Sequence, residues 1–278
     1  MPETAVCGNK TKFENVSRPG LREDRIQMIE RGVYAQYLQR LESLRYVMNL
    51  DTMGQRVDDY ADYEYVGNIT IGTPGQPFVV FGGEDEDQLA VPDTTFGLAT
   101  HISSDFRSDP TDGILGLAFT SLAENNVVPP LINAIRQNLL DEPIFTVWMA
   151  HRGAEEGVHG GMFTYGGFDK ENCGPIIAYE PLTSATYFQF RMKAIGAGKY
   201  KSKIPYEVIS DTGTSFIGGP KSITDRLARA VGAKYVADED SYVIPCNAKP
   251  PTLDIYIGSH KYPIEPVNYI VSVCDDNV

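Results

Sequence analysis

Short apolar runs separated by glycine, proline and acidic segments make up most of the chain. Residues 65–81, YVGNITIGTPGQPFVVF, carry apolar residues on both sides of a Gly-Thr-Pro-Gly segment, which predicts a strand, a turn and a second strand. Many other short runs are rich in Val, Ile and Thr, and 26 Gly and 18 Pro interrupt them. The pattern therefore predicts a mainly β fold with frequent turns.

Three segments instead show the three-to-four residue spacing of helices. Residues 21–47 form the longest, and residues 129–140 and 221–231 each begin at or just after a proline, which predicts two short helices. The acidic, tyrosine-rich residues 57–65, VDDYADYEY, are expected to be a linker. Residues 82–87, GGEDED, are expected to form an exposed exit turn, because buried carboxylates are costly.

Composition excludes several classes of partner. The chain has 278 residues, a net charge of -13 and a pI near 4.7, so neither nucleic acid nor an anionic membrane surface would attract it. No run of 18 apolar residues predicts a membrane span. The start, MPETAVCGNKTKF, lacks the regions of a signal peptide, whereas sequons at Asn9, Asn15 and Asn68 and four cysteines suit a secretory-pathway protein.

Most kinds of catalytic or metal site find no support. His151 and His159 flank Glu155 and Glu156, but a solvated hairpin loop explains this glycine-rich segment better than a metal site, because no HExxH spacing accompanies it. Walker, dinucleotide-binding and G-x-S-x-G motifs are absent from the sequence. We therefore expect neither a metal nor a cofactor.

One segment does point to chemistry. Residues 208–219, VISDTGTSFIGG, place Asp211 between two apolar runs, which predicts a loop held between two buried strands. A carboxylate survives such burial only when it is hydrogen-bonded or paired. The segment therefore predicts a functional carboxylate and raises the question of its partner.

The chain resembles the pepsin-like aspartic proteases, most closely the cathepsin D-like and nematode members. The resemblance spans residues 60–273 and is carried by YVGNITIGTPGQPF, DPTDGILGLAF, GGMFTYGGFDKENCGP, PLTSATYFQF and VISDTGTSFIGGP. It implies two β-rich lobes with a peptide cleft between them, preceded by a helical segment like the family's inhibitory propeptide. The implied divisions are residues 1–60 for the propeptide-like segment and linker, 61–180 for a truncated N-terminal lobe and 181–278 for a C-terminal lobe without its last strands.

The resemblance also implies roles for the Asp-Thr-Gly loop. In this family two carboxylates share one proton and activate a water against a peptide bond, so the implied substrate is a peptide or protein and no cofactor is required. Asp211 corresponds to the second-lobe catalytic acid. Thr212 would brace the loop, Gly213 would allow close approach of the substrate, and Thr214 and Ser215 would border the peptide.

This sequence departs from the family in two places. The first Asp-Thr-Gly and the flap should follow GQPFVVF, but the chain passes through GGEDED to Phe96–Ala99, which predicts an internal deletion joined near Val80–Gly83. Asp51, Asp93 and Asp112 offer no substitute acid. The first-lobe copy of the strand that braces the Asp loop is expected at 114–116, ILG, and the second-lobe copy is missing before the end at CDDNV.

The sequence leaves three hypotheses for function. The first is an aspartic endopeptidase family member that retains only Asp211 and is inactive in this form. The second is a catalytically dead relative that binds peptides or a protease. The third, a homodimer in which two copies of Asp211 meet, is disfavoured because the partial first lobe would obstruct a two-fold approach. The resemblance implies a lysosomal or secreted protein.

The sequence leaves the pairing of its cysteines open. Cys246 would bond with Cys274 or with a cysteine beyond the present end, and Cys173 would remain single.

Overall fold

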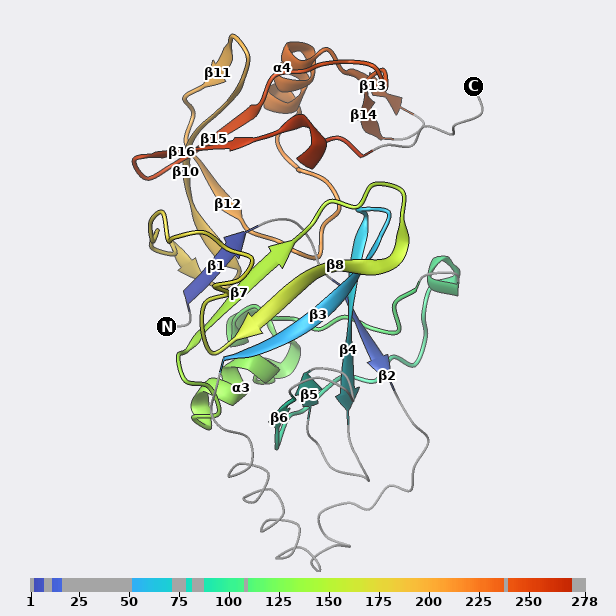
Figure 1. Cartoon of the computed structure of the whole chain (residues 1–278), viewed down its shortest axis with the longest axis vertical. Coiled ribbons are helices and arrows are strands. Elements are labelled where there is room, and N and C mark those ends of the chain that lie inside the picture. Colours follow the sequence, from blue (N-terminus) through green and yellow to red (C-terminus); the bar gives the residue numbers. More distant parts are fainter. Residues whose placement is uncertain are drawn as a thin grey trace, which may run out of the picture.

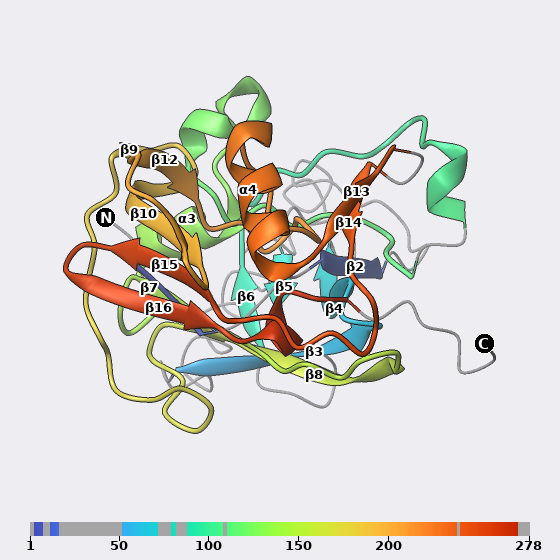
Figure 2. The ribbon, with the colours of Figure 1, turned by 90° about the horizontal axis from the view of Figure 1, so that it is seen from above.

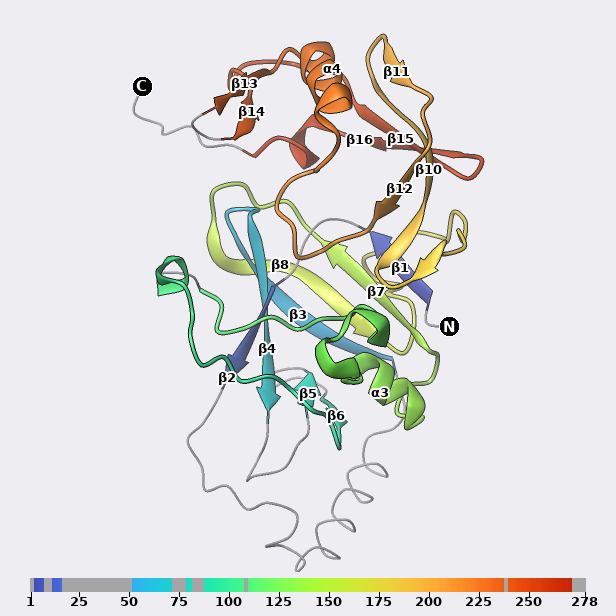
Figure 3. The same cartoon turned by 180° about the vertical axis from the view of Figure 1, so that it is seen from behind.

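The computed structural model describes residues 3–7, 12–16, 52–71, 79–81, 88–107, 110–237 and 240–271 (Figure 1). These residues form two strand-rich units, one built on a large sheet and the other on a smaller sheet (Figures 1 and 3). The mainly β prediction is confirmed. The predicted helix at 21–47, the predicted turn at 82–87, and the positions of Asp51 and Cys274 lie outside the described residues.

The first sheet brings together strands from distant parts of the chain. Its order is β1-β7-β8-β3-β4-β5-β6, and β2 also pairs with β4; β1 with β7 and β2 with β4 are parallel and the other pairs are antiparallel. The strands are β1 (Glu3–Cys7), β2 (Lys12–Val16), β3 (Met53–Tyr60), β4 (Glu64–Ile71), β5 (Val79–Phe81), β6 (Leu89–Val91), β7 (Ile144–Met149) and β8 (Glu156–Tyr165).

Strand β3 (Met53–Tyr60) overlaps the segment 57–65 for which a linker was expected, and that prediction is wrong for residues 57–60. Gln55, Val57 and Asp59 alternate along β3 and are fully buried. Half of the residues on the buried face are therefore polar. The alternation of apolar and polar residues that predicts a strand is for this reason not visible in the sequence. The Gln55 amide is satisfied there, because it donates to Asn68 O at 2.8 Å and accepts from Tyr165 OH at 3.0 Å.

The predicted hairpin is confirmed in its described part. Strands β4 and β5 pair antiparallel, with Ile69 opposite Phe81 and Ile71 opposite Val79. Strand β5 then pairs antiparallel with β6, with Phe81 opposite Leu89, so the three strands form a meander.

Both short helices that were predicted to follow a proline are present. Helix α3 (Pro130–Arg136) is shorter than the predicted 129–140 and packs Leu131 and Ala134 into the first core, whereas α4 (Lys221–Val231) matches its prediction. Short 3-10 turns lie at η1 (Ser104–Arg107), η2 (Thr120–Leu122), η3 (Glu124–Asn126) and η5 (Pro266–Asn268). None of the helices in the described part of the chain is long and apolar enough to cross a membrane.

The expected bracing strand at Ile114–Gly116 does not form. Residues 114–116 have no regular structure, and Ile114 is 78% exposed, while only Leu115 and Leu117 pack partly against the first core. No strand of the described residues pairs with residues 114–116 and holds their backbone extended. The apolar run at 114–117 is therefore explained by the packing of Leu115 and Leu117 against the first core, and it does not form a buried strand.

The second sheet has the order β11-β10-β15-β16, and β9 and β12 also pair with β10. Its core contains Met192, Ile195 and Leu253, against which α4 packs Ile223. Figure 2 shows α4 between this sheet and the β13–β14 hairpin. The strands are β9 (Ser184–Ala185), β10 (Phe188–Ala197), β11 (Tyr200–Ser202), β12 (Tyr206–Ile209), β13 (Lys234–Val236), β14 (Ser241–Val243), β15 (Leu253–Ile257) and β16 (His260–Ile264).

Phe188 joins the two units. Its ring lies 5.2 Å from that of Phe119 and 5.4 Å from that of Phe145, centroid to centroid. Nearby, Phe119 N donates to Thr186 O at 3.1 Å. The chain passes from one unit to the other through residues 174–182, which are mostly exposed and have no regular structure.

The cysteines differ from expectation. Both Cys173 and Cys246 are disulfide-bonded, so the expectation that Cys173 is single is wrong. Disulfide formation depends on the approach of two cysteines in space, which the sequence spacing does not reveal.

The different environments of two isoleucines can be tested by the same substitution. Ile144 is 6% exposed in β7, so Ile144→Ala should lower the free energy of unfolding by about 2–5 kcal/mol. Ile114→Ala should change it by less than about 0.5 kcal/mol, because the side chain is already in solvent. Urea denaturation measures the free energy of unfolding of both variants. An equal decrease for Ile114→Ala would indicate that residues 114–116 form the buried bracing strand after all.

Candidate active site

The Asp-Thr-Gly segment lies on an exposed loop. It follows β12 and leads into α4, so the expected second strand is absent and the expected burial of Asp211 is wrong. Phe216 and Ile217, which suggested that strand, are 56% and 53% exposed. The loop is tied to the second sheet at its start, where Ser210 N donates to Phe188 O at 3.1 Å.

Both carboxylate oxygens of Asp211 accept hydrogen bonds from the loop itself. Gly213 N donates to Oδ1 at 2.9 Å, and Thr214 Oγ1 donates to Oδ2 at 2.5 Å. A Cβ at position 213 would lie 3.3 Å from Asp211 Oδ1, so glycine leaves room for the carboxylate. The half-buried Thr212 makes no side-chain hydrogen bond among the described residues, so the side-chain hydrogen bond within this loop comes from Thr214.

Ser215 connects the loop to the first sheet. Its hydroxyl donates to Tyr63 O at 3.0 Å, and the adjacent Phe216 ring meets the Tyr63 ring edge-on at 5.9 Å between centroids. Ser215 was expected to border the peptide, whereas here its hydroxyl is engaged by the turn between β3 and β4. No local pattern in the sequence could reveal this contact, because the two residues are 152 positions apart.

The β3–β4 turn has an unusual backbone. Ala61 and Asp62 both lie in the left-handed region, with φ of 53° and 57°. The Asp62 carboxylate accepts hydrogen bonds from Arg152 N at 2.7 Å and from Gly153 N at 2.8 Å. His151 Nδ1 lies 2.5 Å from Asp62 Oδ2, so the loop between β7 and β8 holds this turn.

Residues 151–155 form the exposed hairpin loop that was predicted here, between β7 and β8, whereas residues 156–161 belong to β8. His151 pairs with Asp62, and His159 is partly buried, with a pKa lowered by burial and by the nearby Arg56 and Arg152 cations. Glu155 and Glu156 are exposed. Within the described residues, no cluster of histidine, cysteine or acidic side chains has the arrangement of a metal site.

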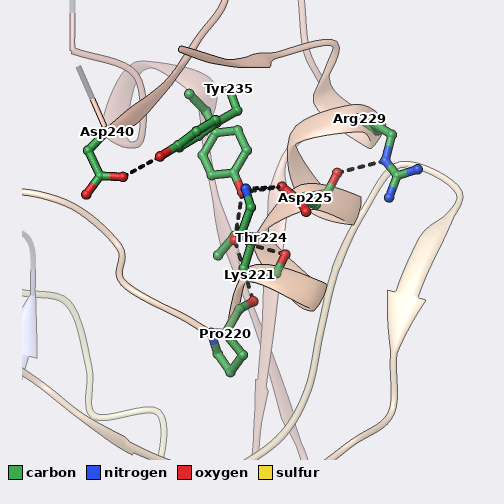
Figure 4. Close-up of polar contacts among 8 residues, drawn as sticks. Pro220, Lys221, Thr224, Asp225, Arg229, Tyr235 and Asp240 are labelled. Carbon is green, nitrogen blue, oxygen red and sulfur yellow. Dashed lines mark hydrogen bonds and ion pairs between the residues drawn. The ribbon is translucent and has the colours of Figure 1, made fainter. Parts of the chain in front are cut away.

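The far end of the Asp211 loop is anchored at α4 (Figure 4). Lys221 Nζ lies 3.0 Å from Asp225 Oδ1 and 4.0 Å from the centre of the Tyr235 ring. Tyr242 OH donates to Asp225 Oδ1 at 2.6 Å and lies 2.9 Å from Thr224 Oγ1. The β13–β14 hairpin thus fixes the first turn of α4, and with it the point where the loop ends.

These contacts change the titration of Asp225. The Tyr242 hydroxyl, and next the Lys221 ammonium, lower the pKa of the Asp225 carboxyl.

A shallow depression elsewhere, lined by Gly198, Lys199, Tyr200, Arg226, Arg229 and Ala230, involves no residue of the Asp211 loop.

Residues 86–277 match the eukaryotic aspartyl protease family. Aspartic protease 6 of Caenorhabditis elegans is 45% identical over 306 residues, which cover 88% of this chain and 79% of the relative. Aspartic protease 2 of Necator americanus is 45% identical over 202 residues, covering 73% of this chain and 47% of the relative. Vacuolar protease A of Aspergillus fumigatus is 32% identical over 165 residues, covering 58% of this chain and 41% of the relative.

The anchor at α4 predicts a pKa change. Tyr242→Phe should raise the pKa of Asp225 toward the ordinary range of an aspartate, because the largest cause of its lowered pKa is removed. The stabilisation from a lowered carboxyl pKa is present above the unfolded pKa and is lost as pH falls through the folded pKa. The contribution of Asp225 ionisation to the free energy of unfolding should therefore be the same in the variant and in the unchanged chain in strong acid. Carbon-13 NMR of the Asp225 carboxyl measures the shift.

Tyr235→Phe is the matched control. Its hydroxyl donates to Asp240 at 2.5 Å and makes no hydrogen bond with Asp225. An equal change in the pKa of Asp225 in both variants would contradict the assignment to Tyr242.

Proposed function

Because the chain belongs to the eukaryotic aspartyl protease family, we propose that it is a member with only the second catalytic acid, Asp211, and that it does not cleave peptide bonds in this form. The observation that carries the proposal is the state of the Asp211 carboxylate. Both of its oxygens accept hydrogen bonds from Gly213 and Thr214 in its own loop, and the side chain is exposed.

The chemistry of the family explains why one acid is insufficient. Two carboxylates that face each other share a proton, and the ionised partner takes a proton from the attacking water. A single exposed carboxylate that accepts hydrogen bonds from its own backbone and threonine has the arrangement of an ordinary turn residue. Asp211 alone therefore supplies a general base without the matched general acid.

The comparisons support loss of an internal segment. The alignment with aspartic protease 6 covers 306 residues, whereas 88% of 278 residues is about 245, so roughly 60 aligned positions have no counterpart in this chain. The family match begins at residue 86, directly after the junction predicted near Val80–Gly83. A deletion at that junction would remove the first Asp-Thr-Gly and the flap together.

The remaining assignments follow from the family. We propose a lobe boundary near residue 180, in the exposed segment at 174–182, and a propeptide-like role for the residues before the first lobe. Gly213, Thr214 and Ser215 would lie along a bound peptide, with Thr212 supporting the loop. Relatives named as vacuolar proteases support an acidic compartment, lysosomal or secreted, as the place of action.

The proposal predicts no turnover. The purified full chain should not cleave a denatured protein or a fluorogenic peptide between pH 3 and 6. Loss of one positioned acid–base group costs roughly two to four orders of magnitude in rate. Turnover that pepstatin blocks and that Asp211→Asn abolishes would contradict the proposal, whereas turnover unaffected by Asp211→Asn would identify a contaminating protease.

A restored chain provides the positive control. Replacing residues 82–87 with the corresponding longer segment of aspartic protease 6, and adding the strands with which that relative ends its second lobe, should produce cleavage that depends on Asp211. Binding of pepstatin to the unrestored chain without any turnover would support the alternative role of a catalytically dead peptide-binding relative.

A further inference from the structure

Asp59 is a buried carboxyl at the end of β3. It is fully buried, and Gly160 of β8 passes directly over it, because a Cβ at position 160 would overlap with the Asp59 side chain. Its Oδ1 accepts a hydrogen bond from Asp62 N at 2.8 Å, while its buried Oδ2 has no hydrogen-bond partner in the part of the chain that the structure describes. An ionised carboxylate with an unsatisfied oxygen is costly in such a place.

The charges around Asp59 reinforce this preference for the neutral acid. Burial first, and then the neighbouring Asp62 carboxyl, raise the pKa of Asp59 to about 7, against a weaker opposing effect of the Arg152 cation. The facing groups on the other elements are Tyr65 on β4, whose pKa is also raised by burial, and His151, which pairs with Asp62.

The turn that Asp59 supports is also the turn that contacts the Asp211 loop. Left-handed backbone at a residue other than glycine is unfavourable and persists only where other contacts compensate. Asp59 Oδ1 supplies one such contact to Asp62, and the Asp62 carboxylate is held in turn by His151, Arg152 and Gly153. The next residue, Tyr63, receives the Ser215 hydroxyl.

We propose that the β3–β4 turn positions the Asp211 loop through Tyr63 and Ser215, and that ionisation of Asp59 weakens this positioning as pH rises toward neutrality. The connection runs from Asp59 to the Asp62 backbone, then to Tyr63 O and the Ser215 hydroxyl. It involves the folding of the loop and not catalysis, so it stands whether or not the chain cleaves peptides.

The direction of the pH effect follows from the two states of Asp59. At pH below about 4 the carboxyl is protonated both in the closed turn and in an opened, solvated turn, so the closed turn has its full stability. Between about 4 and 7 only the closed turn retains the proton, and rising pH favours opening. Above about 7 both states are ionised and the effect levels off.

Hydrogen exchange with mass spectrometry can test this sequence of effects. After correction for the intrinsic exchange rate, protection of residues 208–220 should fall by up to about tenfold per pH unit between pH 4 and 7 and then level off. Asp59→Asn keeps the acceptor for Asp62 N and cannot ionise, so its profile should be flat. Asp58→Asn, a neighbour on β3 whose partner is Arg56, should retain the original profile.

A second variant tests the connection to the loop. Ser215→Ala removes the hydrogen bond to Tyr63, so protection of residues 208–220 should be low at every pH while residues 57–66 keep their own pH dependence. Residues 253–264 of the second sheet serve as the reference segment.

Two results would overturn the proposal. One is an unchanged pH profile of residues 208–220 in Asp59→Asn. The other is an equal fall of protection in residues 208–220 and 253–264 of the unchanged chain, which would indicate general destabilisation rather than positioning of one loop.

Discussion

The position of β3 in the centre of the first sheet is the constraint on which most of this structure depends. It pairs with β8 along its whole length and with β4 at its end, and it buries one face completely. Two of the buried side chains are polar, and they differ in how they are satisfied. Gln55 has partners for both ends of its amide, whereas among the described residues Asp59 has a partner for one carboxylate oxygen. Strand β3 therefore carries both a buried polar side chain that is fully hydrogen-bonded, Gln55, and one whose ionisation can weaken its surroundings, Asp59.

The sequence predicted the features that depend on local pattern. Alternating residues gave the β4–β5 hairpin, and proline followed by helical spacing gave α3 and α4. Strand β3 was missed because Gln55 and Asp59 stand where apolar residues signal a buried face. Ile114 was misplaced for the opposite reason, since an apolar residue is no guarantee of burial when its segment pairs with none of the described strands.

The sequence predicted which residues form the candidate site, but not how exposed that loop is or which other parts of the chain it contacts. Asp211, Gly213 and Thr214 do form one hydrogen-bonded loop, as a short motif can specify. Its exposure and its contact with Tyr63 depend on residues more than a hundred positions away, which a single sequence does not connect. The pairing of His151 with Asp62 was missed for the same reason, because the two residues belong to different loops.

The register between β3 and β8 also affects how the chain can be synthesised. Met53 pairs with Tyr165, so β3 has no β8 partner until more than a hundred further residues have left the ribosome. Closing so long a loop is entropically unfavourable, and sheets built from such distant strands fold slowly. Until then β3 presents an unpaired edge that can pair with other nascent chains. Production of this protein is therefore expected to depend on chaperones that shield the first sixty residues during translation.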